Sequence, residues 1–316
     1  MSRRRDARCQ RGVALITALL VVAIAAAAAT ALARQQQLTI QRSSNVLNAE
    51  QAWLYALGAE AFAHQVLRRD AEDGDSDHPG EGWATLVPPT AIDGGDLFGR
   101  LEDLQGRFNL NNLVGEAGPD ALQVGLFQRL LEQLELPSAI AWNVVDWLDG
   151  DQEPAPAGGA EDLEYLRRDP AYRTAGRALA SPSELLLIDG FDMAAYRRLE
   201  PYVTALPTAT PLNVNTAPVP LLQALSNRFD QSTAEQLAVD GEDDAYASLD
   251  AFLDQVEALA GKESRAELAE LPLAVGSRHF QFTGEARFGR GRVRLASLVA
   301  RDAGSVKTLR RSRENL

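Results

Sequence analysis

The stretch RGVALITALLVVAIAAAAATALAR, from Arg11 to Arg34, decides how the rest of the chain is placed. The 21 residues between Gly12 and Arg34 carry no charge, and Thr17 and Thr30 are the only polar side chains among them. As a helix they would rise about 30 Å, which is the thickness of a bilayer's hydrocarbon core. Five arginines and one acidic residue precede the run, and such a basic leader stays in the cytoplasm. The remainder of the chain is therefore predicted to be exported.

Three interpretations are open for this apolar run. A cleaved signal peptide would use Ala31-Leu32-Ala33 as its cutting site, but the apolar core of such a peptide is usually only about 7–15 residues long. An uncleaved anchor is the second interpretation. The third is one long helix from Val13 to about Arg69, because residues 35–69 lack proline and continue with an apolar stripe at helical spacing. The stripe consists of Leu38, Val46, Leu47, Trp53, Leu54, Leu57, Ala61 and Phe62.

The basic leader, the glycine before the apolar helix and the amphipathic continuation together resemble the type IV pilin-like family. In that family a prepilin peptidase cuts after the glycine, here Gly12, and the new N-terminal residue, here Val13, is methylated. The family's usual glutamate at the fifth mature position is replaced by Thr17. This departure, together with a large helical insertion, is typical of the K pseudopilins of type II secretion systems.

The exported part is strongly acidic. The chain of 316 residues has a net charge of −13, and without a leader that contributes +4 it would carry −17. Such a charge repels the phosphate backbone of nucleic acids. The single cysteine, Cys9, lies in the leader, so the exported part would contain no disulfide and no thiol nucleophile.

Strand signals lie at both ends of the exported chain. Trp83 to Val87 is predicted to be a short strand that ends at two prolines, and residues 96–110 are predicted to form a hairpin that turns at Gln105-Gly106. Alternating apolar residues over 280–299, around Gly289-Arg290-Gly291, predict a second hairpin. Residues 120–270, between these strands, have mostly helical patterns.

We therefore predict an α+β fold in which a large all-helical insertion domain interrupts an antiparallel, pilin-like sheet that follows a membrane-spanning helix. The expected ranges are a leader (1–12), a transmembrane part (13–33), a pilin-like α+β domain (34–112 and 272–304), the helical insertion domain (113–271) and a mobile tail (305–316). The tail is predicted because its basic residues show no apolar pattern. The segment QGRFNLNNL (residues 105–113) strengthens the resemblance, since K pseudopilins carry a Gly-basic-x-Asn-Leu-Asn segment where the insertion begins.

An acidic loop is the candidate metal site. Six carboxylates surround a loop rich in proline and glycine, and hard cations such as calcium take several oxygen ligands at once. An EF-hand is excluded. Counted from Asp149, the sixth position is Pro154 and not glycine, and the twelfth is Ala160 and not glutamate. The residues alone leave a solvated acidic loop as the alternative. The resemblance implies calcium, because K pseudopilins bind it in this region. The expected ligands are Asp149, Asp151, Glu153, Glu161 and Asp162. Asp146, which precedes them, is expected to support these ligands without binding the ion itself.

Other segments offer weaker candidates. The alternating Asp73, Asp75 and Asp77 are interpreted as solvated, since the flanking Gly74 and Pro79 provide no rigid scaffold. The segments at 184–190 and 213–217 resemble parts of helix-hairpin-helix modules, which leaves an exported, membrane-anchored DNA-binding protein as the alternative function. The acidic surroundings oppose it, and no nucleic acid is expected. The three histidines are isolated and no hydrolase or nucleotide-binding motif occurs, so no enzymatic activity is expected.

The resemblance implies a place and partners for the protein. K pseudopilins sit in the inner membrane with the C-terminal domain in the periplasm, at the tip of the pseudopilus. There they form a complex with the minor pseudopilins I and J and prime assembly of the filament built by the major pseudopilin. The implied partners are therefore these pseudopilins, the prepilin peptidase and, in secretion across the outer membrane, the secreted substrates.

Overall fold

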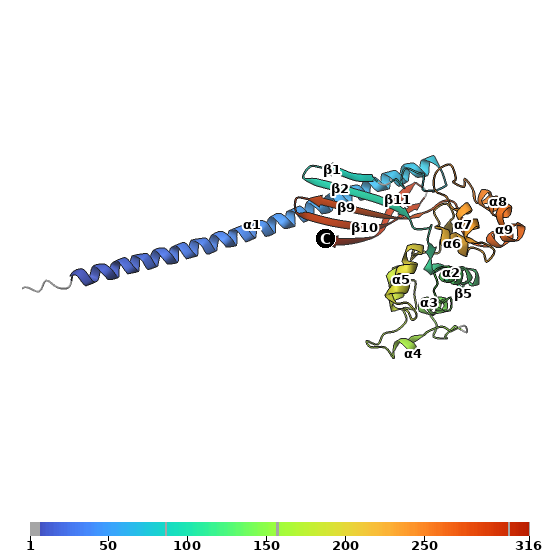
Figure 1. The fold of residues 1–316 in the computed structure, drawn as a ribbon, viewed down its shortest axis with the longest axis horizontal. Coiled ribbons are helices and arrows are strands. Elements are labelled where there is room, and N and C mark those ends of the chain that lie inside the picture. Colours follow the sequence, from blue (N-terminus) through green and yellow to red (C-terminus); the bar gives the residue numbers. More distant parts are fainter. Residues whose placement is uncertain (1–6, 86, 156–157, 303, 316) are drawn as a thin grey trace, which may run out of the picture.

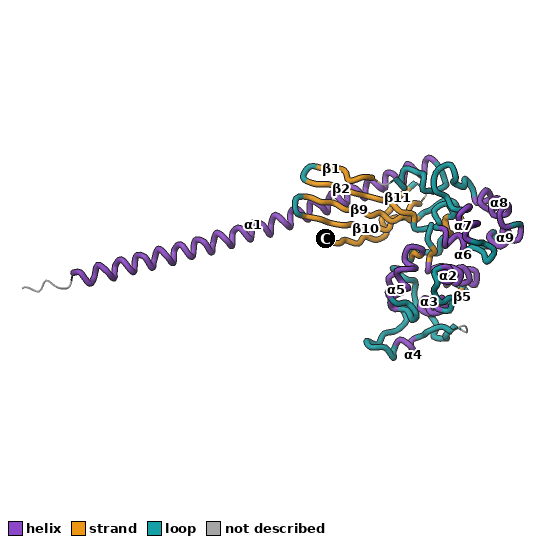
Figure 2. The backbone as a smooth tube through the Cα atoms, in the orientation of Figure 1, coloured by secondary structure: helices purple, strands orange, loops and turns teal. Residues whose placement is uncertain are grey.

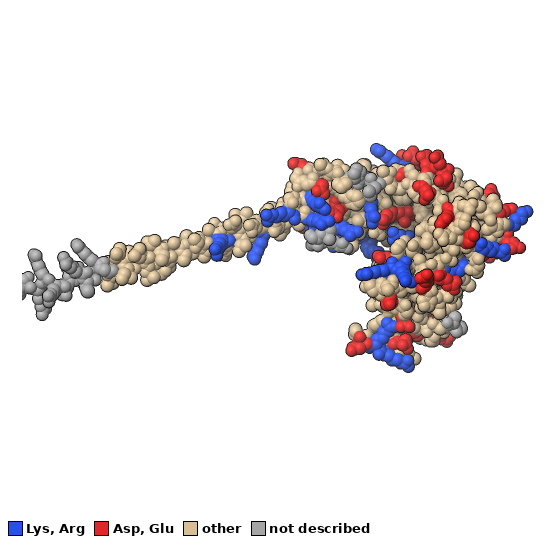
Figure 3. Space-filling model, in the orientation of Figure 1, with Lys and Arg blue, Asp and Glu red and all other residues tan. Residues whose placement is uncertain are grey.

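The computed structural model describes residues 7–85, 87–155, 158–302 and 304–315. Its longest element is α1 (Ala7–Asp73), a helix of 67 residues. The N-terminal half of α1 stands free, and its C-terminal half lies along a sheet (Figure 1). The apolar part, residues 13–33, is long and apolar enough to cross a membrane, is exposed throughout and carries no charged side chain (Figure 3). The single long helix predicted from the sequence is confirmed.

The sheet has five antiparallel strands in the order β1-β2-β9-β10-β11, and α1 covers one of its faces (Figure 2). This α+β arrangement and the predicted C-terminal hairpin are confirmed. The strands are β1 (Val87–Ile92), β2 (Gly95–Asp103), β9 (His279–Phe288), β10 (Gly291–Asp302) and β11 (Ser305–Asn315).

Small residues bring α1 close to the sheet. Ala52, Ala56 and Ala63 recur at steps of four and seven residues and are buried against the sheet's inner face. The alternating residues of β9 and β10, with Phe280 and Phe282 among them, supply the bulky side of this core. At the membrane-facing end, a Cβ on Gly291 would overlap the backbone of α1 at Asn48 and Ala49, so glycine permits the first contact between helix and sheet.

The block between β2 and β9 has a hydrophobic core of its own. Its helices are α2 (Ala121–Gln133), α3 (Ile140–Leu148), α4 (Asp162–Tyr165), α5 (Met193–Leu199), α6 (Val219–Ala224), α7 (Gln231–Leu237), α8 (Leu249–Ala260) and α9 (Lys262–Leu268), with 3-10 turns η1 (Leu110–Leu113), η2 (Pro182–Leu187) and η3 (Glu200–Tyr202). Short strand pairs join β3 (Phe108–Asn109) to β6 (Val203–Thr204), β4 (Val114–Gly115) to β5 (Gly118–Pro119), and β7 (Leu212–Asn213) to β8 (Leu273–Ala274). The predicted start at Ser181 is a capping box with Glu184.

Two local predictions near the first strands were wrong. Residues 96–110 do not form a hairpin: β2 pairs with β1 and β9, and Phe108 pairs with β6 of the insertion. Trp83 lies in a turn, and the first strand is β1, which contains both prolines. Prolines lack a backbone N–H, and an edge strand such as β1 needs fewer of these donors.

The predicted mobile tail was also wrong. Residues 305–315 form β11, which pairs with β10 along its whole length at the edge of the sheet. Backbone pairing needs no apolar pattern, and α1 supplies ionic partners for the basic side chains. Arg311 lies 2.8 Å from the buried carboxylate of Glu60, and Thr308 donates to the same group at 2.9 Å.

Candidate functional site

The acidic loop folds back on itself between α3 and α4. Asp149 and Asp151 follow the end of α3, and Glu161 directly precedes α4. Tyr165 of α4 is fully buried and packs edge-on against Trp147 of α3, with ring centroids 5.3 Å apart. This packing returns Glu161 to the end of α3. One carboxylate oxygen from each of Asp149, Asp151 and Glu161 lies within 4.8 Å of the other two.

The negative charges of these carboxylates repel one another, and several of their oxygens accept no hydrogen bond within the described part of the chain that would offset the repulsion. Oδ1 of Asp149 and both carboxylate oxygens of Glu161 are buried and have no hydrogen-bond partner among the described residues. Burial, followed by the charges of Asp146, Asp149 and Asp151, raises the pKa of Glu161 to about 7. Burial and the charges of Asp151 and Asp146 likewise raise the pKa of Asp149 to about 6. The protein alone leaves this cluster under-satisfied, which is costly for buried charges.

Asp146, in α3, holds the loop in place through a hydrogen bond to its backbone. Its carboxylate accepts a hydrogen bond from the backbone N–H of Ala155 at 3.2 Å. A Cβ at Gly159 would overlap this carboxylate, so glycine lets the loop pass over it. Burial raises the pKa of Asp146, and the Ala155 hydrogen bond opposes that change. Asp146 therefore fixes the loop as well as adding negative charge to the cluster.

The structure brings together three of the five predicted ligands and leaves two apart. Asp162 accepts hydrogen bonds from the backbone N–H of Thr174 at 3.0 Å and from its hydroxyl at 3.1 Å, and it pairs with Arg173 at 2.6 Å. Glu153 is exposed to solvent. Three convergent carboxylates with unpaired oxygens suit a hard divalent cation, and calcium would complete its six to eight ligands with backbone oxygens and water.

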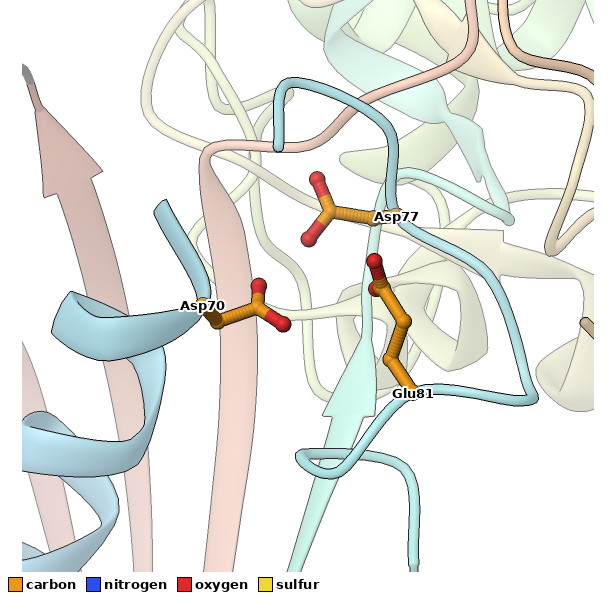
Figure 4. Close-up of side chains that lie close together, drawn as sticks. All are labelled: Asp70, Asp77 and Glu81. Carbon is orange, nitrogen blue, oxygen red and sulfur yellow. The ribbon is translucent and has the colours of Figure 1, made fainter. Parts of the chain in front are cut away.

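A second acidic cluster has a different character (Figure 4). Asp70 comes from the end of α1, Asp77 and Glu81 come from the loop that follows, and their carboxylates point toward one another. Arg301 of β10 lies 2.6 Å from Asp70 and 2.5 Å from Asp77. Glu81 accepts a hydrogen bond from Trp83 Nε1 at 2.5 Å. Each carboxylate already has a donor, so this cluster anchors α1 and its loop to the sheet.

This anchor has no clear local signature in the sequence. Of the alternating aspartates, Asp77 is buried while Asp73 and Asp75 are exposed, so the solvated interpretation fails at Asp77. Its partner Arg301 lies more than two hundred residues away in the chain. A long-range ion pair of this kind leaves no local pattern.

The Asn-Leu-Asn-Asn segment (residues 109–112) holds residues 206–210 of the insertion in place. Asn109 accepts a hydrogen bond from the backbone N–H of Leu206 at 3.1 Å, and Asn111 donates to the carbonyl of Leu206 at 2.8 Å. Asn112 donates to the carbonyl of Thr210 at 2.8 Å. The three side chains therefore satisfy an extended loop that would otherwise expose its backbone groups.

The segments that resemble helix-hairpin-helix modules serve packing. Asn213 is fully buried and donates to the carboxylate of Asp103 at 3.0 Å. In the other segment a Cβ on Gly190 would overlap Ile140, so this turn faces the core of the insertion. The neighbouring N–H of Asp189 already donates to the hydroxyl of Tyr165 at 3.2 Å. These groups are engaged within the protein and do not offer a phosphate-binding turn.

An apolar groove lies beside α1 in the sheet domain. It has a volume of about 510 Å³ and lies between α1 and strand β2, with Gly58 and Phe62 on the helix side and Leu97 and Leu101 on the strand side. Phe62 is 62% exposed. The predicted stripe continues along α1 toward the membrane, where Leu38, Val46, Leu47 and Leu54 are exposed too. The chain's own fold leaves this stripe largely uncovered.

Comparisons with known proteins agree with these features. Two family models, both described as "Type II secretion system (T2SS), protein K", match residues 106–208 and 212–272. The type II secretion system protein K of Pseudomonas aeruginosa is 42% identical, covering 96% of this chain and 93% of its own length. The protein of the same name from Klebsiella pneumoniae is 33% identical, covering 96% of both chains.

A solved structure gives the same fold. It is a chain of the GspK-GspI-GspJ complex of the type 2 secretion system from enterotoxigenic Escherichia coli, with a TM-score of 0.76 and 26% identity. The match covers 87% of this chain and all of that one. Sequence, family models and fold therefore agree, and the chain belongs to the type II secretion system protein K family.

Proposed function

We propose that the protein is a minor pseudopilin that sits at the tip of the pseudopilus, primes assembly of the filament and takes part in protein secretion across the outer membrane. The observation that carries the proposal is the side chain at the fifth mature position. Thr17 Oγ1 donates back to its own helix, to the carbonyls of Val13 at 3.1 Å and Ala14 at 3.0 Å. It offers no carboxylate to the N-terminal amine of a neighbouring subunit.

An unpaired charge is expensive inside a helix bundle of low dielectric. Inside the filament, a glutamate at this position would pair with a neighbour's amine, so a subunit without it fits best where one side of its helix stack is free. The insertion supports the same position. It extends beyond the C-terminal end of α1, away from the membrane part (Figure 1), where it would obstruct a subunit packing above.

We infer that α1 anchors the protein as a single span in the inner membrane, with the sheet and the insertion in the periplasm. Prepilin peptidase would remove the leader after Gly12, because the basic leader ends at this glycine and the apolar part of α1 begins directly after it, in a helix that continues far beyond Arg34. Intact-mass analysis of the protein from cells should therefore show an N-terminus at a methylated Val13. An N-terminus at Arg34 would rule out this processing.

The partners we propose are the minor pseudopilins I and J and, below them, the major pseudopilin. The exposed stripe and the groove beside α1 suit the apolar helix of such a subunit. The glycine and alanine residues on the helix side of the groove allow close helix approach. Secreted substrates would meet the outer surface of the insertion.

We also propose that Asp149, Asp151 and Glu161 hold a calcium ion. The unpaired buried oxygens of this cluster support the proposal. When bound, the ion would offset two of the three negative charges of these carboxylates and fix the loop between α3 and α4. Its role is structural, and it would keep the insertion rigid at the tip.

A further inference from the structure

The part of α1 between the membrane and the sheet is unsupported. The side chains of residues 34–47 are all exposed to solvent. Contact with the sheet begins at Asn48, which lies against Gly289 and Gly291. At about 1.5 Å per residue, this bridge is about 20 Å long. A helical segment of only about 14 residues is marginally stable in water by itself, unless its sequence strongly favours helix.

The sequence of the bridge favours helix less than its flanks do. Residues 34–48 contain no alanine, whereas residues 13–33 contain ten and residues 49–63 contain six. Ser43, Ser44 and Asn45 follow one another, and each is a poorer helix former than alanine because its side chain competes for backbone hydrogen bonds. Thr39 already bonds back to the carbonyl of Gln35 at 2.9 Å, a contact that tends to bend helices.

The bridge also lacks the side-chain pairs that stabilise exposed helices. Arg34 and Arg42 are its only charged residues, and no acidic residue lies within residues 34–48 to pair with them. Its apolar side chains, which include Ile40 at 69% and Leu47 at 65% exposure, are not covered by any part of the chain that the structure describes. The segment would gain stability only when another helix packs against it.

We propose that residues 42–48 of α1 are a hinge, which bends while the subunit stands alone in the membrane and becomes straight helix when partner helices cover the bridge. The straightening step rests on the proposed partners; the bending does not. The hinge would let the domain swing relative to its membrane span and take the orientation that docking requires. The continuous helix in Figure 2 corresponds to the straight state.

The test is a distance distribution from electron paramagnetic resonance on the full-length protein in nanodiscs. Spin labels at Ala29→Cys and Glu72→Cys, both exposed and outside the stripe, flank the hinge in a Cys9→Ser background. A straight helix places their backbones about 65 Å apart. We expect a broad distribution that extends to shorter distances, and a narrow one near the straight-helix value in Ser43→Ala, Ser44→Ala, Asn45→Ala protein. The three substitutions should reduce the bent population roughly tenfold.

A second pair of labels, Gln51→Cys and Glu72→Cys, lies within the part of α1 that the sheet supports and should give a narrow distribution in every sample. A narrow long distance in the unmodified subunit alone would overturn the hinge, as would a broad distribution that the alanine variant leaves unchanged. Adding purified minor pseudopilins I and J should narrow the distribution. If the subunit alone bends and these partners leave it bent, the straightening step and the proposed partners are wrong while the hinge itself stands.

Discussion

Calcium should raise the melting temperature of the detergent-solubilised protein by about 5–10 °C at pH 7.5. At a hundred times its dissociation constant, a ligand selective for the native state stabilises it by about 2.7 kcal/mol, and in a chain of this size each kcal/mol shifts the melting temperature by about 2–4 °C. The carboxylates of Asp149, Asp151 and Glu161 are the expected ligands because their oxygens converge and several lack any other partner among the described residues. Differential scanning calorimetry with and without calcium measures the effect.

The effect should depend on pH in a stated direction. The folded protein raises the pKa of Glu161 from 4.5 to about 7 and that of Asp149 from 3.8 to about 6, so it binds protons more tightly than the unfolded chain. Without metal, this contribution to stability is therefore present at low pH and is lost as the pH rises from about 4 to about 7. Calcium must compete with these protons, so its stabilising effect should be large at pH 7.5 and small at pH 5.

Glu161→Gln separates a metal site from a solvated acidic loop. It removes one buried charge, so the metal-free variant should be at least as stable as the unmodified protein at pH 7.5 and should not respond to calcium. Glu153→Gln is the matched control, since it changes the same loop at an exposed carboxylate outside the cluster and should keep the full response. The calcium site would be contradicted if the unmodified protein showed no heat of calcium binding. It would also be contradicted if both variants lost the calcium-dependent rise in melting temperature to the same extent.

Phe62→Glu should weaken capture of the minor pseudopilins I and J by more than tenfold. Phe62 is 62% exposed and lines the groove beside α1, so the substitution leaves the protein's own core intact. A buried aromatic side chain at the centre of an interface is commonly worth 2 kcal/mol or more, which is about a thirtyfold change in affinity. Introducing a carboxylate there adds the cost of burying a charge without a partner. Surface plasmon resonance on the purified subunits measures the loss.

Leu122→Glu provides the control for this experiment. Leu122 is 46% exposed at the start of α2 in the insertion, far along the chain from the groove, and glutamate in the first turn of a helix is favourable. Capture should be unchanged in this variant, and both variants should melt close to the unmodified protein. Equal binding by Phe62→Glu and the unmodified protein would show that the partners dock elsewhere.

Local patterns in the sequence predicted the parts of the fold that depend on near neighbours. The apolar run and the stripe predicted α1, and the alternation over residues 280–299 predicted the hairpin of β9 and β10. Partners distant in the chain could not be predicted in this way. The sequence could not indicate that Phe108 pairs with Val203, or that Glu60 holds β11 through Arg311. The basic residues of 305–315 show no local pattern, which predicts a tail, because their partners lie on another element.

For the candidate site, too, local composition predicted one part and distant contacts decided the rest. The density of carboxylates in residues 146–162 identified the loop, since local composition is visible in sequence. It could not separate Glu161, which turns inward, from its neighbour Asp162, which Thr174 and Arg173 hold outward. That difference depends on how Tyr165 packs against Trp147, which is a property of the folded insertion.

The proposed cap position can be tested directly by electron microscopy of assembled filaments that carry a gold label on the exposed loop at residues 242–244 of the insertion. We expect one label cluster at one end of each filament, because Thr17 provides no carboxylate for a following subunit and the insertion would block further packing. Labels distributed along the shaft would contradict a tip position.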